Sequence, residues 1–350
     1  MTRRSPLLLL ALGLAAACNQ PAQPTPPPGA EPPGDTLKAA AAALGKRVGV
    51  AAQSGLLGDP RYRAVVAREF SDVTPEFEMK WAVIEPSRGV RNFAPTDALL
   101  SDAAALGLTA RGHTLVWHRS VPSWAESLNP ADFRIAFEEH IRAVARHYAG
   151  RVRAWDVVNE AMADSGQGRR DSIFQQKLGD GYIADAFRLA HDADPQAQLF
   201  YNDYGGEGMT AKSNRIYELV TSLISQGVPI HGVGLQMHIN AQNFSSGASV
   251  GANMGRLGAL GLRVHITEMD VRIDTVSGSA TLRNNVQRSA YHEIVSACVR
   301  EPACDAVTFW GLTDAQSWIS NSGFDGPLLF DANYLAKHAY YGVLDALRVR

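Results

Sequence analysis

The chain has little net charge, few cysteines and no apolar stretch long enough to span a membrane as a helix. Of its 350 residues, 33 are Lys or Arg and 35 are Asp or Glu, giving a formal net charge of −2. Because no basic cluster accompanies this balance, nucleic acid and anionic membrane surfaces are not expected as partners. The three cysteines form no zinc-binding spacing, and no His-Glu-x-x-His motif is present. No metal site is therefore expected, and a neutral ligand fits the charge better.

The N-terminal residues carry the pattern of an export signal. Arg3 and Arg4 precede an apolar run from Leu7 to Leu14, and the small residues 15–17 follow it. The apolar run is too short for a transmembrane helix. Residues 1–17 are therefore predicted to be a signal peptide.

Cys18 follows this segment directly and resembles the lipidated cysteine of a bacterial lipoprotein. Together with the proline-rich stretch up to residue 36, it predicts a lipid anchor followed by a tether that has no core of its own. We expect the protein at the bacterial cell envelope or surface, in contact with the membrane only through Cys18. Ordinary secretion after cleavage at Ala17 is the alternative.

From residue 37 to residue 350 strand-like apolar runs alternate with helix-like stretches, without a linker or a change of composition. Asn129 and Pro130 begin one such helix, and residues 282–298 carry a helical apolar stripe. This alternation predicts one α/β domain, a (β/α)8 TIM barrel of parallel strands covered by helices. A doubly wound open sheet is the competing fold, but no Gly-x-Gly-x-x-Gly follows the first run. The predicted strands are Arg47–Ala52, Glu69–Thr74, Thr109–Trp117, Arg153–Val158, Gln198–Asn202, Gly232–Met237, Arg263–Thr267 and Ala306–Gly311.

Polar and aromatic residues stand where these strands end. Because barrel active sites lie at the carboxyl ends of the strands, we expect these side chains to share one rim. The residues are Glu76, Lys80, Trp81, His113, Trp117, His118, Asn159, Glu160, Asn202, Asp203, Gln236, His238, Glu268, Asp270 and Trp310.

Glu160 and Glu268 are the predicted reacting pair. They are far apart in the sequence, and a closed sheet would bring them together across its mouth. Two carboxyl groups at one rim suit the hydrolysis of a glycosidic bond, in which one protonates the leaving oxygen and the other acts at the anomeric carbon. We expect His238 to hydrogen-bond Glu268 and Asp270 to orient His238. The alternative is that each glutamate forms a structural salt bridge.

The tryptophans divide into a core residue and candidates for sugar binding. Trp155 lies inside a predicted strand and is assigned to the core. Trp81, Trp117, Trp310 and Trp318 follow or end strands, where a flat ring can stack on a sugar. We expect at least two of these four to contact substrate.

Cys298 and Cys304 remain once Cys18 is assigned to lipidation. An even pair in an exported protein predicts a disulfide that closes a short loop. Two buried free thiols are the alternative.

Six segments together resemble glycoside hydrolase family 10, the family of endo-β-1,4-xylanases. They follow the family's order, and the likeness spans residues 37–349. The segments are VTPEFEMKW at 73–81, GHTLVWH at 112–118, WDVVNEA at 155–161, GLQMH at 234–238, ITEMDV at 266–271 and FWG at 309–311.

The resemblance implies a TIM barrel that hydrolyses internal β-1,4 bonds of xylan by a retaining, double-displacement mechanism. Xylan or xylo-oligosaccharide is then the expected partner. Independently of the resemblance, we expect a monomer. Glu160 matches the family's acid/base, Glu268 its nucleophile, and Asn159 the residue that bonds the sugar 2-hydroxyl. The likeness also implies no cofactor and a disulfide between Cys298 and Cys304. The other matching positions are Glu76, Lys80 and His113 along the non-reducing side, Gln236 and His238 around the nucleophile, and Trp310 and Trp318 as aromatic walls.

Phe77 departs from the family pattern, which places Asn after Glu76 to bond the second sugar from the cleaved bond. We expect the chemistry to survive and the preference for short or decorated chains to depend on Phe77. The same mechanism acting on another β-glycoside is one alternative. A non-catalytic glycan-binding lipoprotein of the cell surface is a distant one, because both glutamates are intact.

Overall fold

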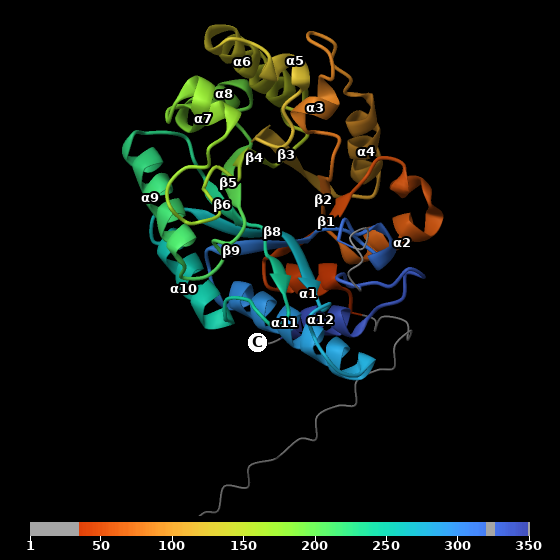
Figure 1. Ribbon diagram of the computed structural model, residues 1–350. Coiled ribbons are helices and arrows are strands. Elements are labelled where there is room, and N and C mark those ends of the chain that lie inside the picture. Colours follow the sequence, from red (N-terminus) through yellow and green to blue (C-terminus); the bar gives the residue numbers. More distant parts are fainter. Residues whose placement is uncertain (1–34, 320–325, 349–350) are drawn as a thin grey trace, which may run out of the picture.

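Eight parallel strands close into a barrel in the part of the chain that the computed structural model describes, residues 35–319 and 326–348 (Figure 1). Each strand pairs with the next one around the barrel, and the pairings of β1 with β9 and of β6 with β8 close the sheet. The prediction of a (β/α)8 barrel is confirmed. The predicted signal peptide, Cys18 and most of the tether lie outside the described residues. The barrel strands are β1 (Arg47–Ala52), β2 (Asp72–Pro75), β3 (Thr109–Trp117), β4 (Ala154–Asn159), β5 (Gln198–Asp203), β6 (Gly232–Leu235), β8 (Arg263–Arg272) and β9 (Cys304–Phe309).

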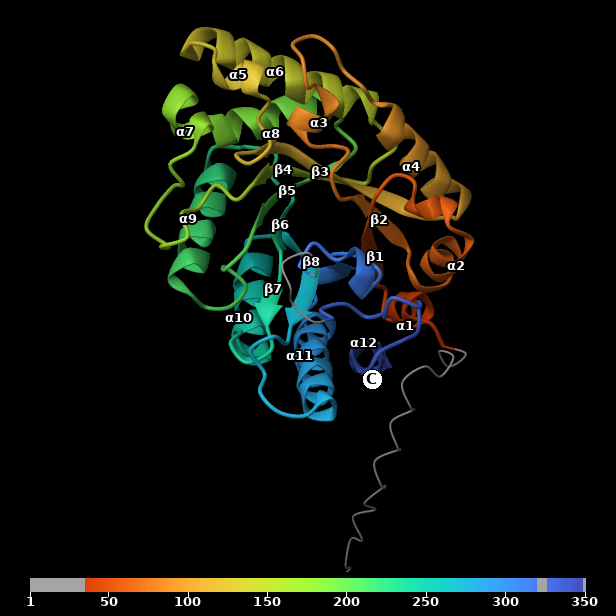
Figure 2. The same ribbon diagram turned by 45° about the vertical axis from the view of Figure 1, so that its right-hand side comes forward.

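Helices surround the barrel in both views (Figures 1 and 2). No helix of the described ranges is both long enough and apolar enough to span a membrane. The longer helices are α1 (Leu37–Ala43), α2 (Pro60–Glu69), α4 (Ala94–Ala105), α6 (Pro130–His147), α8 (Tyr182–Ala193), α9 (Ala211–Ser225), α10 (Gly247–Gly258), α11 (Ala280–Arg300) and α12 (His338–Arg348). The short ones are α3 (Trp81–Ile84), α5 (Ser123–Glu126), α7 (Ile173–Leu178) and the 3-10 turns η1 (Leu56–Gly58) and η2 (Asp314–Gln316).

Helix α6 shows how the sequence sets a helix against the sheet. The Asn129 side chain accepts a hydrogen bond from the Asp132 backbone N–H at 3.0 Å, and Pro130 occupies the first helical position. Phe133 and Phe137, one turn apart on the same face, are fully buried. The N-cap thus fixes where the helix begins, and its apolar stripe fixes which side faces the barrel.

The barrel interior below the rim holds a buried ionic group. Arg111 Nε lies 3.1 Å from Asp156 Oδ2, and Arg111 Nη1 lies 2.8 Å from His265 Nδ1. Asp156 Oδ2 also lies 3.0 Å from His113 Nδ1. Burial alone would raise the pKa of Asp156, but the Arg111 charge and the His113 hydrogen bond lower that pKa to about 2. An ionised Asp156 therefore orients His113 from beneath.

Several predicted strand boundaries are wrong. The seventh predicted strand runs on to Arg272, and the eighth begins at Cys304 and ends at Phe309. Two further boundaries are wrong for identifiable reasons. Asp59 caps a helix that runs on to Glu69, so Glu69 ends α2 and the second strand starts at Asp72. The sixth predicted strand stops at Leu235, because Met237 adopts φ +67°.

Beyond Met237 the chain forms a separate short strand, β7 (His238–Asn240), which pairs with the end of β8 (Figure 2). In this register His238 stands opposite Asp270.

A disulfide joins Cys298 near the end of α11 to Cys304 at the start of β9. It closes a loop with a sequence separation of six residues on the side of the barrel where the strands begin.

Candidate active site

A cavity of about 390 Å³ opens at the carboxyl ends of the barrel strands. Both predicted reacting glutamates and all eight predicted substrate-binding residues line it, so the closed sheet gathers side chains that the sequence distributes over more than 240 positions. The lining residues are Glu76, Phe77, Lys80, His113, Trp117, Arg119, Asn159, Glu160, Tyr204, Gln236, His238, Glu268, Trp310 and Trp318.

Three of the four candidate tryptophans, Trp117, Trp310 and Trp318, face this cavity. Trp81 does not. Its ring is buried in the core, stacked on His140 with centroids 4.5 Å apart. Trp81 begins α3, and its ring packs against Trp124 of α5 and Phe174 of α7 instead of facing the cavity. Trp155 is fully buried, as expected of a strand residue.

Glu268 projects from β8 and is buried between polar partners. Asn202 Nδ2 donates a hydrogen bond to its Oε1 at 2.7 Å, and His238 Nε2 lies 3.1 Å from its Oε2. The other ring nitrogen of His238, Nδ1, lies 2.8 Å from Asp270 Oδ2. Trp318 Nε1 donates to that same Asp270 oxygen at 2.9 Å, which holds the aspartate in place. His238 therefore bridges two carboxylates, as the sequence predicts.

These contacts decide the charge on Glu268. Burial alone would raise its pKa, but the charge of His113 and the hydrogen bond from His238 outweigh burial and hold the pKa below its ordinary value. Burial would likewise lower the pKa of His238, whereas Asp270 and Glu268 raise it to about 10. At neutral pH Glu268 is therefore a carboxylate that faces an imidazolium, the state that a nucleophile requires.

Glu160 follows β4 and has different surroundings. Its Oε1 accepts hydrogen bonds from Gln236 Nε2 at 3.1 Å and from Asn159 Nδ2 at 3.3 Å, and its Oε2 lies 3.9 Å from His118 Nδ1. Its backbone has φ +60°, a left-handed conformation that costs a non-glycine residue on the order of 1 kcal/mol. Such strain persists only where surrounding contacts enforce it, so this conformation needs a structural cause.

Amide side chains connect the two carboxylates. Asn202 Nδ2 donates to Asn159 Oδ1 at 2.9 Å as well as to Glu268, and Gln236 Nε2 donates to Asn159 Oδ1 at 3.1 Å as well as to Glu160. Thr267 Oγ1 donates to Asn202 Oδ1 at 2.7 Å, which fixes the orientation of that amide. The pair of glutamates is therefore held in one hydrogen-bonded frame.

Gly234 on β6 makes room for this frame. A Cβ there would lie 2.1 Å from Asn202 Oδ1, closer than real Cβ contacts allow. Only glycine fits this position without moving Asn202.

One wall of the cavity is built from Glu76, Phe77, Lys80 and Trp117. The Lys80 ammonium lies 4.5 Å from the centre of the Trp117 ring and 5.0 Å from that of Phe77. Burial lowers the pKa of Lys80 and raises that of Glu76. Phe77 keeps 42% of its surface exposed, so an apolar ring faces the cavity next to a charged group.

Sequence reasoning missed several residues of the site. Tyr204 and Arg119 line the cavity, and Asn202 contacts Glu268, but no sequence motif predicts a role for any of them. Asn202 is a predicted strand end, and Tyr204 and Arg119 lie within two residues of strand ends. The same positional argument could therefore have included all three.

The arrangement suits acid/base and nucleophilic chemistry by two carboxyl groups. Within residues 35–319 and 326–348, no cluster of three or more His, Cys, Asp or Glu side chains is arranged to hold a metal ion. The reacting groups available to a bound sugar are an ionised Glu268 and, across the amide frame, Glu160.

Comparison with protein families matches residues 36–346 to glycosyl hydrolase family 10. Among curated proteins, the chain is 38% identical to endo-1,4-beta-xylanase B of Thermotoga neapolitana, over 89% of this chain and 91% of that protein. It is 39% identical to endo-1,4-beta-xylanase A of Humicola insolens, over 82% of this chain and 77% of that protein.

Solved structures agree with this match. Native xylanase 10B from Thermotoga maritima superposes with a TM-score of 0.85 at 39% identity, covering 89% of this chain and 98% of that one. Xylanase 10B from Thermotoga petrophila RKU-1, solved in complex with xylobiose, gives a TM-score of 0.85 at 38% identity, covering 91% and 98%.

Proposed function

The chain belongs to glycosyl hydrolase family 10, and on that premise we propose how it works as an endo-1,4-β-xylanase: Glu160 is the general acid and base, and Glu268 is the nucleophile. The observation that carries the assignment is the contrast between the two carboxyl groups. Glu268 faces His238, whose raised pKa keeps it charged, and Glu268 has a lowered pKa of its own. Glu160 contacts neutral amides of Asn159 and Gln236 instead. Environments that differ in this way divide one pair of carboxyls into acid and nucleophile.

The reaction has two steps. In the first, the Glu268 carboxylate attacks the anomeric carbon while Glu160 gives its proton to the departing glycosidic oxygen, which leaves a glycosyl ester on Glu268. In the second, the Glu160 carboxylate takes a proton from a water molecule while the oxygen of that water attacks the anomeric carbon. The ester bond breaks, and Glu268 departs as a carboxylate. Two inversions retain the configuration, and such enzymes hold their carboxyls roughly 5–5.5 Å apart.

The proposed substrate is xylan, cut within the chain, together with its xylo-oligosaccharides. The related xylanase from Thermotoga petrophila in complex with xylobiose supports this substrate class. The cavity has the matching character, because Trp117, Trp310 and Trp318 offer flat faces for sugar rings, while Asn159 and Gln236 offer amides for hydroxyl groups.

Substitution of Glu268 by Ala tests the nucleophile assignment. The Glu268→Ala variant should lose turnover of xylan and keep its affinity for xylo-oligosaccharides, measured by calorimetric titration. Undiminished hydrolysis would remove Glu268 from its role, and loss of binding together with turnover would indicate that the substitution disturbs the whole cavity.

We also propose that the enzyme works at the bacterial cell envelope, anchored through a lipid on Cys18. The support is the order of elements in the sequence: a signal-like segment, a cysteine directly after it, and a proline-rich stretch up to residue 36. The tether would hold the cavity away from the membrane, where a polymer could reach it.

A further inference from the structure

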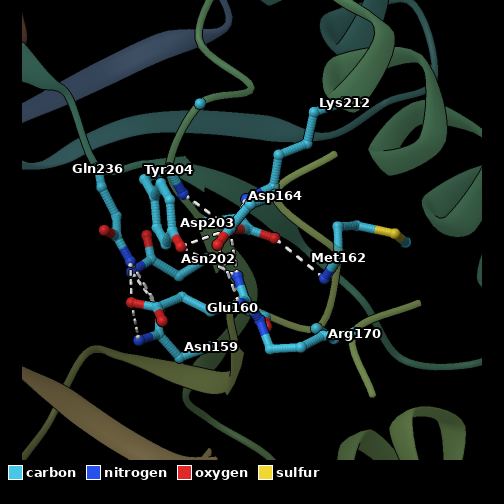
Figure 3. Close-up of polar contacts among 12 residues, drawn as sticks. Asn159, Glu160, Met162, Asp164, Arg170, Asn202, Asp203, Tyr204, Lys212 and Gln236 are labelled. Atoms are coloured by element: carbon cyan, nitrogen blue, oxygen red, sulfur yellow. Dashed lines mark hydrogen bonds and ion pairs between the residues drawn. The ribbon is translucent and has the colours of Figure 1, made fainter. Parts of the chain in front are cut away.

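The segment after β4 folds back so that Arg170 reaches the backbone of Glu160 (Figure 3). Arg170 Nε donates a hydrogen bond to the Glu160 carbonyl at 2.8 Å, and the Arg170 backbone N–H donates to the Ala161 carbonyl, also at 2.8 Å. The Glu160 N–H donates to the Asn202 carbonyl at 2.9 Å. Both polar backbone groups of Glu160 are thus fixed, one by the neighbouring strand β5 and the other by the Arg170 side chain.

Arg170 is itself held in place from two sides. Its Nη2 donates to Asp164 Oδ1 at 2.6 Å and to the Tyr204 hydroxyl at 3.1 Å. The hydrogen bond from Arg170 holds the pKa of Asp164 well below its ordinary value, so this carboxylate stays ionised. Tyr204 also lines the active-site cavity, and this contact therefore ties Arg170 to the cavity wall.

Helix α9 contributes a second cation, Lys212, beside Asp164. Lys212 Nζ lies 2.9 Å from Asp203 Oδ1 and 3.6 Å from Asp164 Oδ1. Asp203 Oδ2 in turn accepts a hydrogen bond from the Met162 N–H at 3.3 Å. Figure 3 shows these side chains converging behind Glu160 from the loop, from the end of β5 and from α9. The Glu160–Arg170 segment is therefore anchored near both of its ends.

We propose that Arg170 is a positioning residue for acid/base catalysis, because its guanidinium holds Glu160 in the left-handed conformation that aims the carboxyl group at the leaving oxygen. The inference rests on the proposed role of Glu160. The φ of +60° is unfavourable for glutamate, and the hydrogen bond to its carbonyl supplies the enforcing contact. Arginine can make both contacts at once, because its Nε donates to the Glu160 carbonyl while its Nη atoms donate to Asp164.

Glu160 and Glu268 are held in place by different side chains. Glu268 is held by Asn202 and His238, neither of which contacts Arg170 through a hydrogen bond among the described residues. Loss of Arg170 should therefore impair proton donation by Glu160 more than attack by Glu268. Leaving groups that depart readily as anions need little protonation, so the effect should depend on the leaving group.

The test compares Arg170→Met with wild type on aryl β-xylobiosides and on xylan. With phenol, whose pKa is about 10, and with xylan, kcat/KM should fall roughly 10²-fold, the lower range of what general acid catalysis contributes. With the strongly acidic dinitrophenol as leaving group, the fall in kcat/KM should be several-fold at most. Arg170→Lys should lie between, because one ammonium cannot serve both partners at the same geometry.

Arg169→Met is the matched control. Arg169 adjoins Arg170 in the same loop, and no hydrogen bond or ion pair joins its guanidinium to Glu160 or Asp164 within the described residues. Its substitution should change kcat/KM on all substrates by the same small factor. An equal loss on phenyl and dinitrophenyl substrates for Arg170→Met, or no loss on either, would overturn the proposal.

Circular dichroism and thermal unfolding show whether Arg170→Met folds. If it does not fold, Arg170→Lys is used as the test variant in its place. A selective loss on phenyl substrates in the folded Lys variant supports positioning, and a uniform loss contradicts it. Glu160→Ala separates this inference from the assignment beneath it. If Glu160→Ala itself shows no dependence on the leaving group, the role of Glu160 fails; if only the Arg170 variants show none, the positioning role fails.

Discussion

The Nε2 atom of His238 lies 3.1 Å from Oε2 of Glu268, while Asp270 binds the opposite ring nitrogen. This geometry follows from the register of β7 on β8, in which His238 stands opposite Asp270. Because Asp270 and Glu268 together raise the pKa of His238 to about 10, the imidazole keeps its positive charge throughout the neutral range. A lasting positive charge beside Glu268 favours its ionised form.

Replacement of His238 by Gln should therefore move the acidic limb of activity. The imidazolium lowers the pKa of Glu268, so its loss should raise that pKa and shift the acidic limb of kcat/KM to higher pH. A shift of about one pH unit corresponds to roughly 1.4 kcal/mol of lost interaction with the carboxylate. The measurement is the pH profile of kcat/KM on a soluble aryl xylobioside. His191→Gln on the outer helix α8 serves as control, and an unmoved acidic limb in His238→Gln would contradict the account.

Phe77 should determine the response to substrate length. It presents an exposed ring to the cavity beside Lys80, where the family pattern has an asparagine. Phe77→Asn should restore a neutral hydrogen bond worth on the order of 1 kcal/mol, or about five-fold in binding. We expect kcat/KM to rise more on short xylo-oligosaccharides than on polymeric xylan, because a short chain has fewer other contacts to rely on.

The control for Phe77 is Val83→Asn, which replaces an exposed apolar residue on neighbouring α3 that does not line the cavity. Rates on oligosaccharides of increasing length, compared with rates on xylan, give the result. Equal changes on short and polymeric substrates would show that Phe77 does not contribute to length preference.

We expect glycine at position 234 to be needed because it leaves room for the Asn202 amide, and not because strand β6 itself needs a glycine. In Gly234→Ala the new methyl group would meet Asn202 Oδ1, so Asn202 must move away from Glu268. We expect a fall in kcat of at least ten-fold and a loss of stability of about 1–3 kcal/mol from overpacking. Chemical denaturation and steady-state kinetics measure the two effects.

Gly251→Ala is the matched substitution, because a Cβ at this position in α10 meets nothing within 4 Å. It should leave activity unchanged and stabilise the helix by about 0.5–1 kcal/mol. Full activity in Gly234→Ala would mean that the position of Asn202 matters less than its contacts indicate.

Attachment through Cys18 predicts a simple change in fractionation. Wild type should sediment with membranes and dissolve in detergent, whereas Cys18→Ser should leave the membrane fraction while keeping its specific activity on xylan. Mass spectrometry of the N-terminal peptide identifies the lipid directly. A wild-type protein that is soluble without detergent, with its N-terminus at Cys18 and no added mass, would favour ordinary secretion instead.

Sequence reasoning located the reacting groups because the topology of a parallel barrel leaves little freedom for strand ends. With eight predicted strands in one barrel, Glu160, Glu268, His238 and Asp270 must share one rim, and the structure brings all four there. The direction of a side chain just past a strand was not determined in this way. Trp81 fails for that reason, since a short helix turns it into the core.

The contacts of Arg170 cannot be predicted from the sequence for a related reason. They depend on a loop that returns to its own starting point and on Tyr204, which follows β5. No periodicity or spacing encodes such a return. The left-handed backbone of Glu160 was equally hidden, because nothing in the sequence marks a glutamate as strained.

The stereochemistry of the first product tests the central claim most directly. If Glu268 forms a covalent intermediate and Glu160 then activates water, proton NMR during early hydrolysis of a xylo-oligosaccharide should show the β-anomer of the new reducing end first, with the α-anomer growing in only by mutarotation. Initial release of the α-anomer would mean a single displacement by water, and Glu268 would then not be the nucleophile.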